Sequence, residues 1–177
     1  MKVFRFDDIC INSQMSEVNK ITGYLLDRFD CEVIWAVSPL VSEGVQERVF
    51  PKILGAYSDV RAFYFPDLCG VPEYREDVTI ATHGLIHADH RLLTKEAQEM
   101  SILVSSSLVG NAKIFVPPFN KWNKDTETIC KEWNIELIKF EDGWLSMEHN
   151  PYMESQDKWY LHHRDMNLDA IREWINY

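Results

Sequence analysis

The chain of 177 residues is long enough to bury a sizeable hydrophobic core, and we expect one domain spanning residues 1–177. Its apolar fraction of 46% and its six Trp favour a packed globule over a disordered chain. The net charge of −10 argues against a binder of nucleic acid or of an anionic membrane, since either partner would require a basic face.

The four cysteines, Cys10, Cys31, Cys69 and Cys130, are scattered without a Cys-x-x-Cys pair, which is typical of reduced thiols in a cytosolic protein. The sequence starts on a strand pattern rather than on an apolar signal segment. No run approaches the roughly 20 apolar residues of a membrane span. We therefore expect a soluble, cytoplasmic protein; the oligomeric state is not indicated.

Strands and helices are predicted to alternate along the chain. In order, the sequence predicts a strand over 2–6, a helix over 17–29, a strand over 31–37, a helix over 42–54, strands over 60–65 and 78–82, a helix over 94–108, a strand over 113–116, a helix over 126–133, strands over 136–140 and 158–161, and a helix over 168–175. The first helix rests on apolar residues at helical spacing, with Ser16 as its N-cap. The alternation indicates βαβ units and a mostly parallel sheet, which is an α/β fold.

Five polar clusters each follow the carboxyl end of a predicted strand. They are Asp7-Asp8, His83 with His87, Pro117-Pro118-Phe119-Asn120, Glu141-Asp142-Gly143-Trp144, and His162-His163. In parallel α/β folds the carboxyl ends of the strands gather on one face, and active sites are built there. We expect these clusters to meet at one rim.

Asp7 and Asp8 are neighbours, and neighbouring residues on a regular strand point to opposite faces. They can serve one centre only where the strand ends and its backbone turns. One carboxylate could then bind a metal while the other takes a proton from water. Alternatively, the pair caps the following segment or forms surface ion pairs.

His83 and His87 are four residues apart, so on a helical turn their side chains would share a face and converge on one ion. Zinc accepts imidazole nitrogen and carboxylate oxygen, and a catalytic site leaves a position for water. The alternative is a structural role for each histidine. His90 could be a further ligand, a group supporting a ligand, or exposed to solvent.

Pro117 and Pro118 would keep the chain extended and project Phe119 and Asn120 over the rim. Aromatic side chains there could wall a sugar site, or could belong to the core. The candidates are Phe119, Trp122, Trp144 and Trp159, and for Trp159, in mid-strand, the core is preferred.

His162 and His163 leave the last predicted strand, where alternation lets only one of them face the centre. That histidine could be a general acid, because imidazole titrates near neutral pH.

Taken together, the clusters resemble the polysaccharide deacetylase family, carbohydrate esterase family 4, also described as NodB-homology-like. Phe6-Asp7-Asp8 resembles its first motif, T-F-D-D, which implies that Asp7 is the catalytic base and Asp8 a metal ligand. His83-x-x-x-His87 resembles the second motif, H-(S/T)-x-x-H, and implies two further ligands, although Gly84 stands where the family often has Ser or Thr.

The remaining motifs are similar in the same order along the chain. The segment 116–120 resembles the third motif, R-x-P-Y, and Asp142-Gly143-Trp144 the fourth, which implies substrate-binding roles for Pro118, Phe119, Asn120 and Trp144. Leu161-His162-His163 matches the fifth motif, L-x-H, which would make His163 the general acid.

The resemblance implies a distorted (β/α)7 TIM-like barrel, and the short chain suggests an incomplete one with an open groove. It also implies a metal-dependent hydrolase that removes an acyl group, in the first instance N-acetyl, from a saccharide by cleaving an amide bond. Metal-activated water would attack, with an Asp base and a His acid. The implied cofactor is a divalent metal, Zn²⁺ first, with Co²⁺ or Ni²⁺ as alternatives.

One residue departs from the family pattern. The arginine of the third motif, which positions the base, is Val116 here. Either another cation replaces it, with Lys121 and Arg164 as candidates, or activity is altered or lost. The alternative functions are therefore a degenerate metal- or carbohydrate-binding module of the same fold, or a hydrolase of a different small amide.

Overall fold

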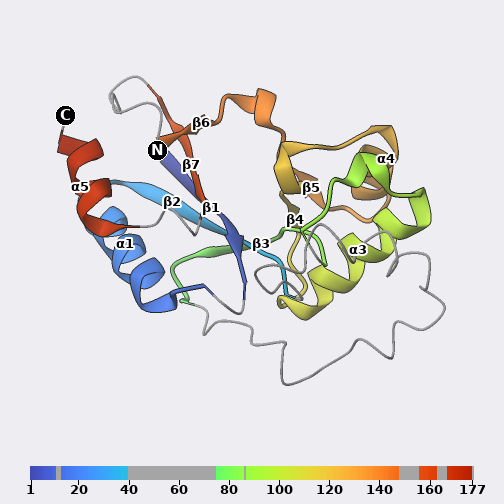
Figure 1. The fold of residues 1–177 in the computed structure, drawn as a ribbon, viewed down its shortest axis with the longest axis horizontal. Coiled ribbons are helices and arrows are strands. Elements are labelled where there is room, and N and C mark those ends of the chain that lie inside the picture. The colour runs from blue at the N-terminus through green and yellow to red at the C-terminus, as the bar shows by residue number, and fades with distance from the viewer. Residues whose placement is uncertain (11–12, 40–74, 86, 148–155, 163–166, 177) are drawn as a thin grey trace.

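The structure, a computed structural model, describes residues 1–10, 13–39, 75–85, 87–147, 156–162 and 167–176 (Figure 1). Its strands are β1 (Lys2–Ile9), β2 (Cys31–Val37), β3 (Thr79–Thr82), β4 (Ile114–Phe115), β5 (Glu136–Leu137), β6 (Leu145–Ser146) and β7 (Lys158–His162). Its helices are α1 (Met15–Arg28), α3 (Lys95–Leu108), α4 (Lys124–Glu132) and α5 (Leu168–Asn176), with 3₁₀ turns η2 (His90–Leu92), η3 (Pro118–Asn120) and η4 (Phe140–Asp142). The helix predicted over 42–54 and the strand over 60–65 lie outside the described residues.

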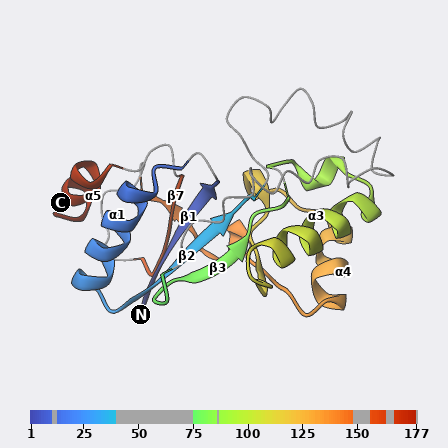
Figure 2. The same cartoon turned by 90° about the horizontal axis from the view of Figure 1, so that it is seen from below.

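The strands form one parallel sheet with the order β5-β4-β3-β2-β1-β7-β6. Figure 2 shows the arrowheads of β1, β2 and β3 pointing the same way, so their carboxyl ends share one edge. The sheet curls into a half-barrel, and the predicted α/β class with a distorted, incomplete (β/α)7 barrel is confirmed.

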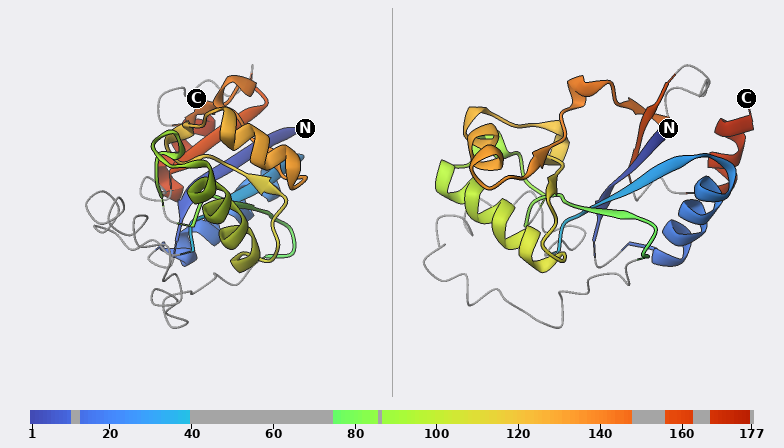
Figure 3. Two further views of the ribbon diagram at one scale, coloured as in Figure 1. Left: turned by 90° about the vertical axis from the view of Figure 1, so that its right-hand side faces the viewer. Right: turned by 180° about the vertical axis from the view of Figure 1, so that it is seen from behind.

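The core lies on both faces of the sheet, because successive residues of each strand point to opposite sides. Phe4, Phe6 and Trp35 are fully buried on the face that packs against α1 and α5. Figure 3 shows these two helices together beside β1 and β2, while α3 and α4 form a second pair toward β4 and β5. Ile34 and Val116 belong to a separate apolar cluster on the opposite face. That opposite face also carries the functional side chains described below.

Several boundaries differ from the sequence-based prediction. Ser16 is not an N-cap: α1 begins at Met15, and Gln14 at its N-cap makes no side-chain capping bond. The two-residue strand β6, in a segment expected to be loop, pairs with β7 at the edge of the sheet. Within the described segments, no helix combines the length and apolar character that crossing a bilayer requires.

Candidate metal centre

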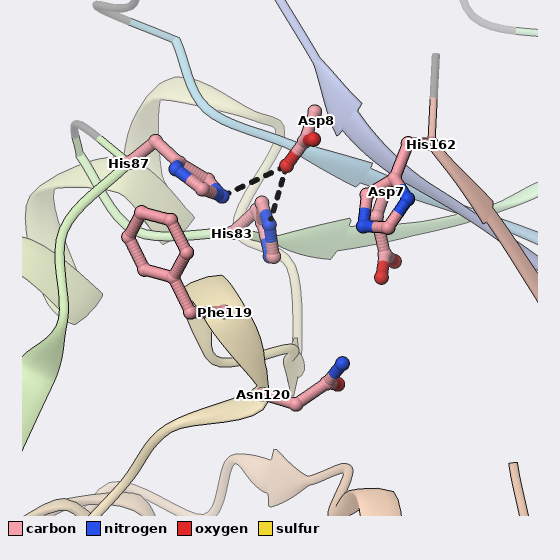
Figure 4. A pocket seen from close by; sticks show the side chains of 7 residues that line it. All are labelled: Asp7, Asp8, His83, His87, Phe119, Asn120 and His162. Atoms are coloured by element: carbon pink, nitrogen blue, oxygen red, sulfur yellow. Dashed lines mark hydrogen bonds and ion pairs between the residues drawn. The ribbon is translucent and has the colours of Figure 1, made fainter. Parts of the chain in front are cut away.

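A pocket lies at the carboxyl ends of β1, β3 and β7 and is closed on one side by η3 (Figure 4). Its lining residues are Asp7, Asp8, His83, His87, Phe119, Asn120 and His162. Four of the five predicted polar clusters therefore meet here. The fourth-motif cluster, represented by Trp144, does not line this pocket.

Asp7 and Asp8 both reach the pocket because β1 is irregular at its end. The pairing register of β1 with β2 shifts between Phe6 and Ile9, and Asp8 has a φ of 62°, in the left-handed region. A bulge of this kind rotates the strand and re-aims its side chains. The irregular backbone at the end of β1 therefore allows both carboxylates to face the same pocket.

His83 and His87 converge through a loop. From the sequence, the two side chains are expected to converge if they lie on a helical turn. The described residues from His83 to Asp89 are not helical, so the convergence has another cause. Gly84 has a φ of 78°, a left-handed conformation that glycine adopts without a side-chain clash. The loop is anchored at its start, since the His83 amide donates to the Val37 carbonyl and the Ser38 hydroxyl donates to the His83 carbonyl, at 2.8 and 2.9 Å.

Asp8, His83 and His87 each offer one ligand atom, and these atoms all lie within 4.8 Å of one another. Asp8 Oδ1 is 2.8 Å from Nε2 of His87 and 3.2 Å from Nε2 of His83 (Figure 4). Two nitrogens and one carboxylate oxygen form a donor set that zinc accepts in catalytic sites.

The second nitrogen of His83 supports this assignment. Its Nδ1 lies 2.7 Å from the Val116 carbonyl oxygen, to which only an N–H can donate. In the neutral imidazole, Nε2 then carries a lone pair that faces the Asp8 carboxylate. Two acceptors 3.2 Å apart repel each other unless a cation lies between them. A backbone carbonyl that fixes the tautomer of a ligating histidine is a regular companion of metal sites. These residues fit a divalent cation.

The electrostatics favour the forms that ligate. Burial acts to raise the pKa of Asp8, but the contacts of its carboxylate with the two imidazoles outweigh burial and hold that pKa well below its usual range. Burial lowers the pKa of His87, which favours its neutral ring. An ionised carboxylate beside neutral imidazole is the state a metal requires.

Asp7 has different partners from Asp8. Arg5, two residues earlier on β1, donates from Nε to Asp7 Oδ1 and from Nη2 to Asp7 Oδ2, each at 2.8 Å. Arg5 Nη2 also donates to Asn120 Oδ1 at 2.9 Å. Both Arg5 and Asp7 are buried. Asp7 is therefore held by a guanidinium and stays outside the ligand set.

Turn η3 places the third-motif residues. Phe119 and Asn120 have φ values of 57° and 53°, two consecutive left-handed residues that turn the chain at the pocket edge. The Phe119 ring lies edge-on to His87, with centroids 4.2 Å apart, and half of the residue is exposed. Pro118 is buried and does not line the pocket.

Solved structures are similar to this chain, although no protein-family model and no curated protein matches it. A CE4 family pseudoenzyme from Bacillus anthracis superposes with a TM-score of 0.61 at 10% identity, over 99% of this chain and 59% of that one. A family 4 carbohydrate esterase from Streptomyces lividans gives 0.58 at 13% identity, over 97% of this chain and 83% of that one. The Bc1960 peptidoglycan N-acetylglucosamine deacetylase gives 0.59 at 12% identity, over 99% and 79%. The chain has the carbohydrate esterase family 4 fold.

The family 4 fold is found in active enzymes and in a pseudoenzyme, so the function depends on the local site. The chain spans 59% of the length of the Bacillus anthracis pseudoenzyme. A mutant of that pseudoenzyme with restored enzymatic activity has a similar structure, with a TM-score of 0.60. The same fold is thus compatible with both outcomes.

Of the two cations suggested as replacements for the third-motif arginine, Lys121 is exposed and Arg164 lies outside the described residues. The sequence interpretation missed Arg5. The sequence feature that could have identified Arg5 is a charged residue between Phe4 and Phe6. It lies two positions before Asp7 and therefore on the same face of the strand. Val116 instead supplies the carbonyl that orients His83.

Four further residues complete the comparison with the sequence-based predictions. His163, the family-based general acid, lies outside the described residues, whereas His162 lines the pocket and pairs in register with Asp7. Trp144 is buried, with its ring 4.6 Å from the Arg5 guanidinium carbon. His90 is fully buried against Phe115, which excludes the solvent-exposed alternative.

Proposed function

We propose that the protein is a metal-dependent hydrolase that removes an acyl group, in the first instance N-acetyl, from a saccharide. One observation carries the proposal: Asp8, His83 and His87 converge on a common point, and beside them Asp7 is held separately by Arg5. A ligand set next to an unligated carboxylate provides both a metal position and a base. Similarity to the fold of family 4 esterases and deacetylases supports it.

Asp8, His83 and His87 would hold the divalent cation, Zn²⁺ in the first instance, with Co²⁺ or Ni²⁺ as alternatives. When bound, such a cation supplies Lewis-acid chemistry that polarises water and the acyl carbonyl.

Asp7 would accept the proton of the attacking water as the water oxygen bonds to the acyl carbon. A backbone N–H near Phe119 would donate to the oxyanion that develops there. The carbon–nitrogen bond then breaks, and a histidine at the end of β7 protonates the departing amine. His162 is the first candidate because it lines the pocket, and His163 is the candidate that the L-x-H resemblance implies.

The saccharide would lie over turn η3. Phe119 presents a half-exposed ring against which a sugar can pack, and Asn120 adds an amide at the pocket. Pro118 and Trp144 were also predicted to bind substrate; as buried residues they would act by supporting this wall. A cytoplasmic location stays a prediction.

The test is acetate release from a panel of N-acetylated sugars, measured with zinc, cobalt or nickel. Because Asp7 is the proposed base, Asp7→Asn should lower kcat by about 100-fold or more while zinc still binds. A variant that kept the wild-type rate would show that the assigned roles are wrong.

A second candidate, a binding module that has lost hydrolysis, is favoured by Val116 at the third-motif arginine position. The same acetate assay separates the two. Zinc binding and saccharide binding without any acetate release on the panel would support the module.

A further inference from the structure

Arg5 is a completely buried charge in the middle of β1, with 0% of its surface exposed. Burying a guanidinium is costly unless it is paired and hydrogen-bonded. Its partner is Asp7, which it meets in a fork of two parallel hydrogen bonds of 2.8 Å. Such bidentate pairs fix geometry as well as charge.

The guanidinium is itself held in place by aromatic rings. Its carbon lies 4.6 Å from the ring centroid of Trp144 and 5.2 Å from that of Tyr160, both within cation–π range. Trp144 belongs to the apolar cluster on this face of the sheet, and Tyr160 packs against it. The position of Arg5 is therefore determined by packing as well as by its bonds to Asp7.

The fork also links two parts of the pocket. Nη2 of Arg5 donates both to Asp7 and to the side-chain oxygen of Asn120 on turn η3. Turn η3 is the segment that would provide the oxyanion donor near Phe119. One side chain thus sets the position of the base relative to the opposite wall.

Among the described residues, Asp8 is paired with His83 and His87 and not with a guanidinium. A flexible Asp7 could turn toward the same cation, because it is the neighbouring residue and carries the same group. The Arg5 fork engages both oxygens of Asp7 and opposes that turn.

We propose that Arg5 is the positioning residue of this site. This inference rests on the proposed function. Arg5 would hold Asp7 as a base that does not ligate the metal. It would perform from strand β1 the task that the family resemblance assigned to an arginine at Val116.

The test compares zinc-loaded Arg5→Ala and Arg5→Lys with the wild type. Misplacing a base costs about 100-fold, so kcat of Arg5→Ala should fall by about that factor. The proposed ligands Asp8, His83 and His87 are unchanged, so zinc affinity in chelator competition should not fall. Because Arg5 also bonds to Asn120, KM can rise, but the loss in kcat should exceed the change in KM. Lysine cannot form the fork, so Arg5→Lys should recover only part of kcat. Added guanidinium ion should partly restore Arg5→Ala.

Arg75 provides a matched control, because it forms the same two-residue-spaced fork with Asp77, at 2.8 and 2.7 Å, on the surface. Arg75→Gln should keep the wild-type kcat, and guanidinium should not change its rate. A folded Arg5→Ala with wild-type kcat would overturn the inference. If Arg5→Ala does not fold, Arg5→Lys carries the same measurements, and wild-type kcat there has the same meaning.

A crystal structure of zinc-loaded Arg5→Ala tests whether Arg5 positions Asp7, independently of turnover. The inference expects the Asp7 carboxylate to be displaced or turned toward the metal, and an Asp7 in its original orientation would overturn it. If the wild-type protein released no acetate, the proposed function would be contradicted. The orientation of Asp7 in the variant would still test whether Arg5 positions that carboxylate.

Discussion

Two identical side chains at adjacent positions have different partners, and the proposed function gives them different tasks for that reason. Asp8 faces two imidazoles and Asp7 faces a guanidinium. The separation depends on the left-handed backbone of Asp8, with a φ of 62°. Residues in such conformations cost about 1–3 kcal/mol and tend to occur at functional sites. The site therefore contains backbone strain where its chemistry is proposed.

The identity of the general acid is a prediction at the level of single residues. His162 pairs with Asp7 in the β1–β7 register, and residues paired in this way point to the same face. His162→Ala should therefore lower kcat by about 100-fold. His163→Ala is the matched control, and its rate should change little. The reverse result would place the acid at His163, as the family resemblance implies.

Much of the site could be predicted from single residues. Asp7, Asp8, His83 and His87 meet as the motifs indicated, because parallel strands bring their carboxyl ends together. The role of Arg5 could not be predicted. Its pairing with Asp7 follows from strand alternation, but its complete burial requires aromatic neighbours from β7 and the segment before β6, which are remote in sequence.

Helix α3 supports the loop that carries His83 and His87 with a buried polar face. The Ser101 hydroxyl accepts from the Leu85 amide at 3.1 Å and lies 3.3 Å from Nε2 of His90. Ser105, one turn later, bonds to the Thr82 hydroxyl at the end of β3. These bonds fix the loop on both sides of His83 and explain how a non-helical segment can orient the two histidines.

Buried His90 predicts how the stability of this element depends on pH. Burial lowers its pKa from 6.5 to about 3, so below pH 6.5 the unfolded chain takes up a proton that the folded chain does not. His90 therefore contributes stability above pH 6.5 that is lost progressively as the pH falls toward 3. Between pH 7.5 and pH 5 the loss is about 2 kcal/mol in the free energy of unfolding.

The measurement is urea unfolding of the wild type and of His90→Gln at both pH values. Other groups titrate in both proteins, so the difference between the two pH dependences isolates His90. The variant should lose about 2 kcal/mol less than the wild type on acidification. Equal losses would show that His90 is protonated in the folded state.

At the level of elements, long periodic segments were predicted well and short ones were not. Residues 31–37 form β2 as predicted, and α3 begins one residue after the predicted start. The strand β6 consists of only Leu145 and Ser146, which is too short to show periodicity. Its position depends on pairing with β7.

In the whole molecule, the sheet brings distant segments together. β7 lies beside β1, although they are at opposite ends of the chain, and this contact places His162 next to Asp7. The alternation of strands and helices predicted the parallel class, but not this order of strands. The order of the strands depends on which face of the sheet each helix packs against. The sequence shows this packing only indirectly.

The proposed ligands come from β1 and from the loop after β3, so a bound cation should cross-link the sheet and stabilise the whole fold. Zinc at about 100 times its Kd should raise the free energy of unfolding by about 2.7 kcal/mol. Thermal unfolding with zinc or with EDTA measures this effect. A transition that is identical in both would contradict metal binding to the folded state.

The most direct test of the central claim is the zinc content of purified protein after equilibrium dialysis. Wild type and Asp7→Asn should each bind about one equivalent, whereas Asp8→Asn, the same chemical change one residue later, should lose it. Retention of wild-type zinc affinity by Asp8→Asn, or no binding by the wild type, would contradict a cation held by Asp8, His83 and His87.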